Sequence, residues 1–252
     1  MHYKVVIADP YQAFEKEFFQ VIGDFDMLGE KIGKGKRNTV KAINLDGLYI
    51  NVKSFQVPHI FNQLAYRWLR KSKARRSYEY ANLLLSKGIG TPKPVAYFEN
   101  MGPFSIKESF YFSEQLVHDL TFRTLIHEPG YPDHENILRQ FTRFTYDMQE
   151  KEVYFKDHSP GNTLIVNNKG SYAFYLVDLN RMEFTKMNFE ERMKNFNRLT
   201  PKKEMVAIMS DEYAKLSNLD PAFVFERMWH HTLEFQNSHQ RKKDLKKKYL
   251  RK

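Results

Sequence analysis

Three polar side chains between residues 157 and 178 carry the clearest chemical pattern in the sequence. Asp157 and Asn162 stand five residues apart in KDHSPGN, and Asp178 follows the apolar stretch SYAFYLV. On a helix, residues five apart point about 140° from each other, whereas a loop shaped by Pro160 and Gly161 can turn both side chains into one cavity. An amide oxygen and a carboxylate make an oxygen-only site that suits Mg²⁺ and accepts phosphate oxygens as further ligands. The pattern therefore predicts Mg²⁺ at Asn162 and Asp178, with Asp157 facing the incoming nucleophile.

Each carboxylate also has a purely structural explanation when it is taken singly. Asp157 could cap its own loop, and Asp178 could cap the end of a strand. Between them, however, lie a strand, a turn and a second strand, TLIV, NNKG and SYAFYLV. A hairpin of this kind brings Asp178 back beside Asn162, which favours a shared site over two unrelated caps.

This order of residues resembles the catalytic loop of protein-kinase-like phosphotransferases, in which an Asp, an Asn five residues later and a hairpin ending in Asp follow one another. The resemblance extends to the amino-terminal part of the chain, where a Gly-x-Gly sequence lies between two expected strands. It implies a phosphate-covering loop with Asn38 in place of a third glycine. The nucleotide-binding residues implied there are Gly33, Gly35, Asn38 and Val40.

A lysine in an apolar strand follows this loop and needs an anionic partner. It is Lys53 in LYINVKSF, and Glu79 lies on the helix expected over residues 59–87. In kinase-like proteins such a lysine orients the nucleotide phosphates and pairs with a helix glutamate. Glu114 and Leu116 fit the connector whose backbone would receive adenine.

The chain departs from the protein-kinase pattern in several places. Phe155-Lys156-Asp157 replaces His-Arg-Asp, Asp178-Leu179-Asn180 replaces Asp-Phe-Gly, and no Ala-Pro-Glu segment follows. These departures favour a compact kinase for a small substrate over a regulated protein kinase.

Within that group, several phrases resemble the Kdo/heptose lipopolysaccharide kinase family over roughly residues 30–200. The resemblance implies ATP- and Mg²⁺-dependent phosphorylation of Kdo or a heptose on lipid A, at the cytoplasmic face of the inner membrane. Asp157 would then be the catalytic residue that orients the sugar hydroxyl. Lys156 could neutralise the transferred phosphate or be a surface lysine, and Arg181 could bind a substrate anion or form a structural ion pair. The resembling phrases are VKSF, SKARRSYEYANLLLSKGIGTPKPVAYFE, KDHSPGNTL and LVDLNRMEF.

The elements expected around these residues define an α+β, bilobal, protein-kinase-like fold. Strands are expected over residues 25–57, turned at Asp46-Gly47, and Ser72 is expected to cap part of the following helix. We expect an antiparallel N-terminal lobe with one main helix over residues 1–116. A helix-rich lobe with the catalytic hairpin should follow over residues 117–240, and a basic tail over 241–252.

The charge distribution indicates an anionic partner. The chain has 40 basic and 30 acidic residues, a net charge of +10, and the sequence RKKDLKKKYLRK at its end has eight basic residues and one acidic residue. A second basic cluster, YRWLRKSKARR, also contains Trp and Tyr. Both could be solvated surface, bind nucleic acid or contact an anionic membrane. Because the implied substrate is an anionic lipid, we expect a membrane surface and no nucleic acid.

Composition sets the remaining limits. There is no cysteine, signal peptide or apolar run long enough for a bilayer, which favours a cytoplasmic, peripheral protein. The histidines have no spacing that predicts a metal site. Two other possibilities stay open: an atypical RIO-like serine kinase and a non-catalytic kinase-like binding protein.

Overall fold

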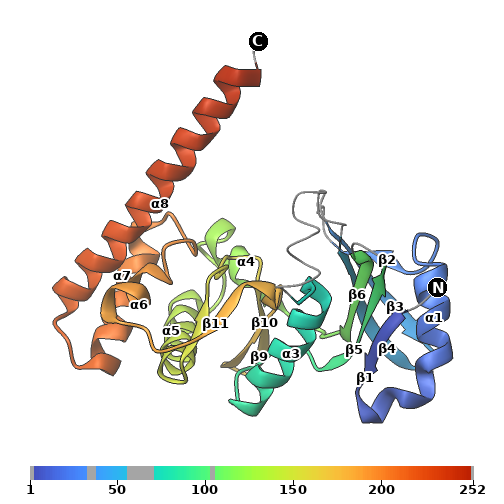
Figure 1. Ribbon diagram of the computed structural model, residues 1–252. Helices are drawn as coiled ribbons and strands as arrows, with labels where there is room; N and C mark the ends of the chain where they lie inside the picture. Colours follow the sequence, from blue (N-terminus) through green and yellow to red (C-terminus); the bar gives the residue numbers. More distant parts are fainter. Residues whose placement is uncertain (1–2, 33–37, 56–70, 103–105, 251–252) are drawn as a thin grey trace. The chain divides into compact units, whose positions relative to one another are not determined.

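The computed structural model describes residues 3–32, 38–55, 71–102 and 106–250. Gly33 and Gly35 lie outside these ranges, as do residues 59–70 of the expected helix. The chain forms two compact units, Met1–Val117 and His118–Lys252 (Figure 1). Each is described by itself.

The first unit is built on a six-stranded antiparallel sheet with the strand order β1-β5-β6-β4-β3-β2. As expected, Asp46 and Gly47 turn β3 into β4, and both have positive φ. The strands are β1 (Tyr3–Ile7), β2 (Glu30–Lys31), β3 (Asn38–Leu45), β4 (Leu48–Phe55), β5 (Pro94–Met101) and β6 (Ile106–Glu114).

The strand expected from residue 25 onward is wrong for most of its length. Only Glu30–Lys31 pairs with β3, and the preceding residues form turns. The buried ammonium of Lys41 explains the difference. It donates to the carbonyls of Phe25 at 2.6 Å, Asp26 at 2.9 Å and Leu28 at 2.8 Å. A buried charge needs such partners, so these residues curl around the lysine instead of extending.

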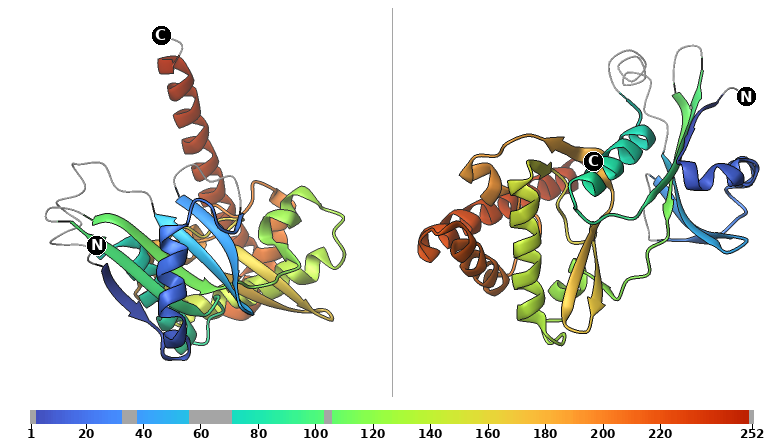
Figure 2. Two further views of the ribbon diagram at one scale, coloured as in Figure 1. Left: turned by 90° about the vertical axis from the view of Figure 1, so that its right-hand side faces the viewer. Right: turned by 90° about the horizontal axis from the view of Figure 1, so that it is seen from below.

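Two helices cover opposite faces of this sheet (Figures 1 and 2). Helix α1 (Glu15–Gly23), which follows the 3₁₀ helix η1 (Asp9–Phe14), buries Phe18 against the ring of Phe98. Helix α3 (Lys73–Ser86) places Tyr78 against Tyr97, which points to the other face because strand residues alternate. Helix α1 was not expected. Ser72 caps α3 as expected, and its hydroxyl accepts from the Arg75 amide.

The second unit is mainly helical and contains two small sheets. One has the order β10-β9-β7, and the other pairs β11 with β8. The elements are β7 (Leu120–Thr121), α4 (Phe122–His127), α5 (His134–Glu150), β8 (Val153–Phe155), β9 (Thr163–Asn168), β10 (Ser171–Leu176), η2 (Leu179–Arg181), β11 (Met182–Phe184), α6 (Phe189–Lys194), α7 (Lys203–Ser217) and α8 (Pro221–Leu250). The expected hairpin of two strands around NNKG is β9–β10.

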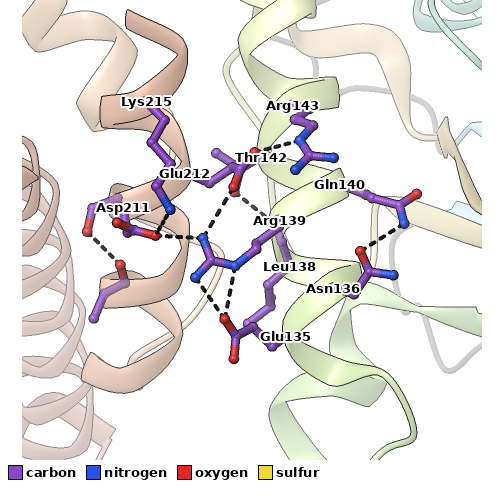
Figure 3. Close-up of polar contacts among 12 residues, drawn as sticks. Glu135, Asn136, Leu138, Arg139, Gln140, Thr142, Arg143, Asp211, Glu212 and Lys215 are labelled. Atoms are coloured by element: carbon purple, nitrogen blue, oxygen red, sulfur yellow. Dashed lines mark hydrogen bonds and ion pairs between the residues drawn. The ribbon is translucent and has the colours of Figure 1, made fainter. Parts of the chain in front are cut away.

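Helices α5 and α7 are joined by an ion-pair network (Figure 3). Arg139 of α5 pairs with Glu135 on its own helix and reaches Asp211 at 2.6 Å and Glu212 at 3.2 Å on α7. Arg143 also binds Glu212, which is almost fully buried. A buried carboxylate is stable only when it is paired. The network therefore fixes α7 against α5.

Helix α8 continues through the segment expected as a separate basic tail. Its first half packs on the unit through Val224, Met228 and Thr232, which are fully buried. Every side chain from residue 237 to 248 is exposed, and Figure 1 shows this half extending beyond α6 and α7. Lys, Arg, Gln and Leu have high helix propensity, and no Gly or Pro interrupts the segment, so the helix continues without packing.

Candidate active site

The predicted catalytic loop joins β8 to β9 and is held by hydrogen bonds to backbone carbonyls. The amide of Lys156 donates to the carbonyl of Arg181 at 3.0 Å and extends the β8–β11 pairing to the residue before Asp157. At the other end, the Asn162 side-chain nitrogen donates to the Asp157 carbonyl at 2.8 Å. This bond closes the loop across Pro160 and Gly161. It also fixes the Asn162 amide so that its oxygen remains for another ligand.

The β9–β10 hairpin brings Asp178 to the same end of the unit as Asn162. Leu176 pairs with Thr163, and the Val177 amide donates to the Asn162 carbonyl at 3.0 Å. Asp178 has a φ of 61°, a left-handed conformation that Asp tolerates better than most residues. The chain therefore turns sharply out of the strand at the residue predicted to bind metal.

The Asp157 carboxylate lies between two arginines. Arg198 donates from Nη1 to Oδ1, and Arg181 Nη1 lies 3.7 Å from Oδ2. The Asp157 side chain is 25% exposed. Arg181, for which the sequence left open an anion-binding role or a structural ion pair, therefore lies beside Asp157. Arg198 was missed, because it is 41 residues away in a segment without a recognisable motif.

Lys156 forms an ion pair with Glu183 on β11 and lies over the ring of Tyr154, 5.7 Å from its centre. The sequence left two explanations open for this lysine, neutralisation of the transferred phosphate or a surface lysine. Its contacts in the structure are those of a partly exposed surface ion pair.

The side chain of His158 supports the loop by packing against two aromatic rings. Its imidazole is fully buried between the rings of Phe141 at 5.3 Å and Phe155 at 5.7 Å. Burial lowers the pKa of His158 to about 4, although neighbouring Asn195 opposes the shift. His158 is therefore neutral at physiological pH and anchors the loop as a packed aromatic residue.

Arg123, another residue that sequence reasoning missed, lies over the loop at Gly161. Its amide donates to the Pro160 carbonyl at 3.0 Å. A Cβ atom at Gly161 would lie 2.7 Å from Arg123 Nη2. The glycine therefore leaves room for the guanidinium beside the catalytic loop.

In the first unit, Lys53 lies on the sheet face that α3 covers. It is directly opposite Val40 on β3 and Tyr111 on β6, and Tyr111 is in register with Tyr97 beneath α3. Lys53 Nζ lies 5.3 Å from the centre of the Phe55 ring. Paired residues point to the same face, so Lys53 and α3 share one side of the sheet.

The predicted partner of Lys53, Glu79, is on α3 as expected. Its carboxylate accepts hydrogen bonds from Lys71 Nζ at 2.7 Å and from Arg75 Nε at 2.8 Å. Partial burial raises the pKa of Glu79, but these hydrogen bonds outweigh it and lower the pKa below its ordinary value. Pairing of Lys53 with Glu79 stays a prediction.

The remaining nucleotide-binding candidates lie at or just beyond strand ends of the same sheet. Asn38 begins β3, immediately after the undescribed residues of the Gly-x-Gly sequence. Glu114 ends β6 and accepts a hydrogen bond from the Tyr11 hydroxyl at 2.7 Å, which contributes to raising the pKa of that tyrosine after burial. The Leu116 carbonyl accepts from the Gln115 side chain at 3.2 Å. Their roles toward adenine stay predictions.

The donors at Asn162 and Asp178 fit Mg²⁺. Asn180 donates to Asp178 Oδ1 at 2.6 Å and thereby orients the carboxylate. In the part of the chain that the structure describes, no group of three His, Cys, Asp or Glu side chains could hold a metal. A two-residue oxygen site is appropriate for Mg²⁺, which keeps several waters and takes phosphate oxygens.

An antiparallel sheet unit followed by a mainly helical unit with a β-hairpin is the arrangement of the protein-kinase-like fold. The model of the "Lipopolysaccharide kinase (Kdo/WaaP) family" matches residues 27–219, which is more than half of the chain. The chain therefore belongs to the lipopolysaccharide kinase family.

A solved structure supports the fold. "WaaP in complex with acyl carrier protein" superposes with a TM-score of 0.62 over 92% of this chain and 98% of that one, at 16% sequence identity. At this identity the similarity establishes the shared fold. No curated protein matches the chain at a significant level. None of the helices within the described ranges is long and apolar enough to cross a membrane.

Proposed function

We propose that the protein is an ATP- and Mg²⁺-dependent kinase that phosphorylates a hydroxyl group of an inner-core sugar, Kdo or a heptose, of lipopolysaccharide. The observation that carries this proposal is the convergence of Asp157, Asn162 and Asp178 at one end of the β9–β10 hairpin. Family membership supplies the class of acceptor. The departures from protein-kinase motifs agree with a small sugar as the acceptor.

In the proposed mechanism, Asp157 accepts a hydrogen bond from the sugar hydroxyl and takes its proton late in the transfer. Lys53 orients the α- and β-phosphates, with Glu79 as its predicted partner. Asn162 and Asp178 would hold Mg²⁺, which would supply neutralisation of the phosphate charge. The hydroxyl oxygen bonds to the γ-phosphorus as the bond to ADP breaks.

Two further side chains are proposed to contact the acceptor. Arg181 is 58% exposed and only weakly engaged by Asp157, so its guanidinium has donors for a substrate carboxylate or phosphate. Lys156 would contribute only after release from Glu183.

The exposed half of α8 is proposed to contact the anionic leaflet in which the acceptor is embedded. Its side chains cannot form a core contact, because all of them from residue 237 to 248 are exposed. Each Lys or Arg near such a leaflet contributes on the order of 1 kcal/mol, reduced by salt. The protein would then act as a peripheral protein on the cytoplasmic side of the inner membrane. The basic side chains of this half are Arg241, Lys242, Lys243, Lys246, Lys247 and Lys248.

The test is transfer from γ-labelled ATP to three acceptors in parallel: Kdo-lipid A, a heptosylated core and a generic protein. Label in one of the two glycolipids supports the proposal and identifies the sugar. Label in the protein alone would favour a RIO-like kinase. ATP binding without any transfer would favour a non-catalytic binding protein. Asp157→Asn should lose the glycolipid label and serves as the control.

A further inference from the structure

The catalytic loop contains no cation of its own between Asp157 and Asn162. The intervening residues are His-Ser-Pro-Gly, and the histidine is buried and neutral, with a pKa of about 4. In phosphoryl transfer, negative charge is spread over the oxygens of the moving group and must be neutralised by cations. Beyond Mg²⁺ and Lys53, that charge must be met by a side chain from another segment.

Arg198 is placed beside the reacting atoms. Its Nη1 donates to Asp157 Oδ1 and also to the Lys156 carbonyl at 3.3 Å. The flat guanidinium lies over the ring of Phe235 on α8, with Cζ 5.2 Å from the ring centre. Both hydrogen bonds use the same nitrogen. Across the residues that the structure describes, the donors on Nε and Nη2 have no protein acceptor.

The segment that carries Arg198 is anchored to the core of the second unit. Asn195 donates from its side chain to the Phe155 carbonyl at 2.8 Å, which ties the α6–α7 connection to the strand before the catalytic loop. Phe196 and Leu199, on either side of the arginine, are buried in the core of this unit. A functional side chain held by such a framework is pre-organised for its ligand.

The other cations near the loop are less suited to this position. Arg123 lies at Gly161, at the other end of the loop from Asp157. Lys156 is engaged by Glu183, and Arg181 is 3.7 Å from Asp157 and 58% exposed. Arg198 is 32% exposed and contacts Asp157 directly. A guanidinium also presents several donors in one plane, which matches the oxygens of a phosphoryl group.

We propose that Arg198 is a catalytic residue that binds the transferred phosphoryl group, an inference that rests on the phosphotransferase activity proposed above. As the sugar oxygen bonds to the γ-phosphorus and the bond to ADP breaks, Nε and Nη2 donate to its non-bridging oxygens. The sugar proton passes to Asp157, which becomes neutral. Its attraction for Arg198 falls at that moment, and the guanidinium follows the new phosphate group.

The test compares Arg198→Ala and Arg198→Lys with Arg227→Ala. Arg227 is a matched control, because it also pairs with a carboxylate in the second unit, Glu190, and is 31% exposed. Two rates are measured: transfer to the glycolipid, and hydrolysis of Mg·ATP by water without any acceptor. Arg198→Ala should lower kcat of both by roughly 10²–10³-fold with little change in the KM for ATP. The lysine variant should be intermediate, added guanidinium ion should partly restore the alanine variant, and the control should keep its rate.

A double variant separates phosphate binding from simple positioning of Asp157. If Arg198 binds the phosphoryl group, Arg198→Ala lowers the residual hydrolysis rate of Asp157→Asn as well. If it changes nothing in that background, Arg198 acts only through Asp157 and the proposal is overturned. Melting temperatures of the Arg198 variants, compared with that of Arg227→Ala, show whether either variant is unfolded. If the alanine variant is unfolded, the lysine variant carries the test.

The acceptor proposal fails separately. Hydrolysis that depends on Arg198, with no label in any glycolipid, would refute the acceptor and leave the role of the arginine supported. A chain that turns over no ATP with water or with any acceptor would overturn both.

Discussion

Burial of His158 makes a quantitative prediction about pH. The imidazole is fully buried and its pKa is lowered to about 4, against an ordinary value of 6.5. As the pH falls from 6.5, the unfolded chain takes up this proton while the folded chain does not. The stability contributed by the neutral ring is therefore complete above pH 6.5 and declines down to about pH 4, where the folded protein is protonated too.

The magnitude follows from the two pKa values. They differ by about 2.5 pKa units, and each unit corresponds to about 1.36 kcal/mol. The total loss in the free energy of unfolding is therefore roughly 3 kcal/mol. Between pH 7 and pH 4.5, most of this loss, about 2 kcal/mol, should be observed. That is a substantial part of the free energy of unfolding of a typical domain, which is about 5–15 kcal/mol.

The perturbation is His158→Phe, which keeps an aromatic ring between Phe141 and Phe155 but removes the titrating nitrogens. The absolute stability of the variant can differ from that of the wild type in either direction. The phenyl ring is slightly larger than the imidazole ring, and it loses any contact with Asn195. The measured quantity is the change in the free energy of unfolding between pH 7 and pH 4.5, from urea titrations of both proteins. Other titrating groups contribute equally to both.

The pH-dependent loss should be about 2 kcal/mol smaller in the phenylalanine variant. Equal losses in the two proteins, with equal m-values, would refute the assignment of His158 as a buried neutral residue. The variant should also keep activity to lower pH, because protonation of His158 removes support from the loop that begins at Asp157.

Other predictions concern the loop, the metal site and α8. Asp157→Ala should lower kcat roughly 10²–10⁴-fold, as expected for loss of a positioned base, and a near-normal kcat with Mg·ATP would show that the loop is misassigned. Asp178→Asn should weaken metal-dependent nucleotide use, with partial recovery at high Mg²⁺ or with Mn²⁺; an unchanged metal titration would count against this ligand. Gly161→Ala should change the free energy of unfolding by less than about 1 kcal/mol, because the atom it meets is the movable end of Arg123. A much larger loss that Arg123→Ala does not relieve would contradict that contact. Deleting residues 241–252 should reduce binding to anionic liposomes and raise the KM for a lipid-embedded acceptor, while kcat and the KM for ATP stay nearly constant. Unaltered liposome binding at low and physiological salt would leave this half of α8 with only a solubilising role.

Local patterns predicted the parts of the fold whose causes are close in sequence. The β9–β10 hairpin follows from two apolar runs around NNKG, and the cap at Ser72 follows from a hydroxyl before a helical pattern. The strand predicted from residue 25 was wrong because the residue that makes this segment turn lies elsewhere in the sequence. Lys41, on a neighbouring strand, requires three carbonyls, and only a turn can direct all three toward one ammonium.

The same distinction explains which of the proposed site residues the sequence indicates. Asp157, Asn162 and Asp178 are joined by one loop and one hairpin, so their spacing already contains their geometry. Arg198 reaches Asp157 only because Asn195 binds the Phe155 carbonyl and the neighbouring side chains enter the core. Those contacts arise from packing between distant segments, and nothing in the spacing of Arg198 records them. A cation supplied from the α6–α7 connection can therefore be found only once the second unit is folded, whereas the carboxylate that it contacts can be found by reading six residues.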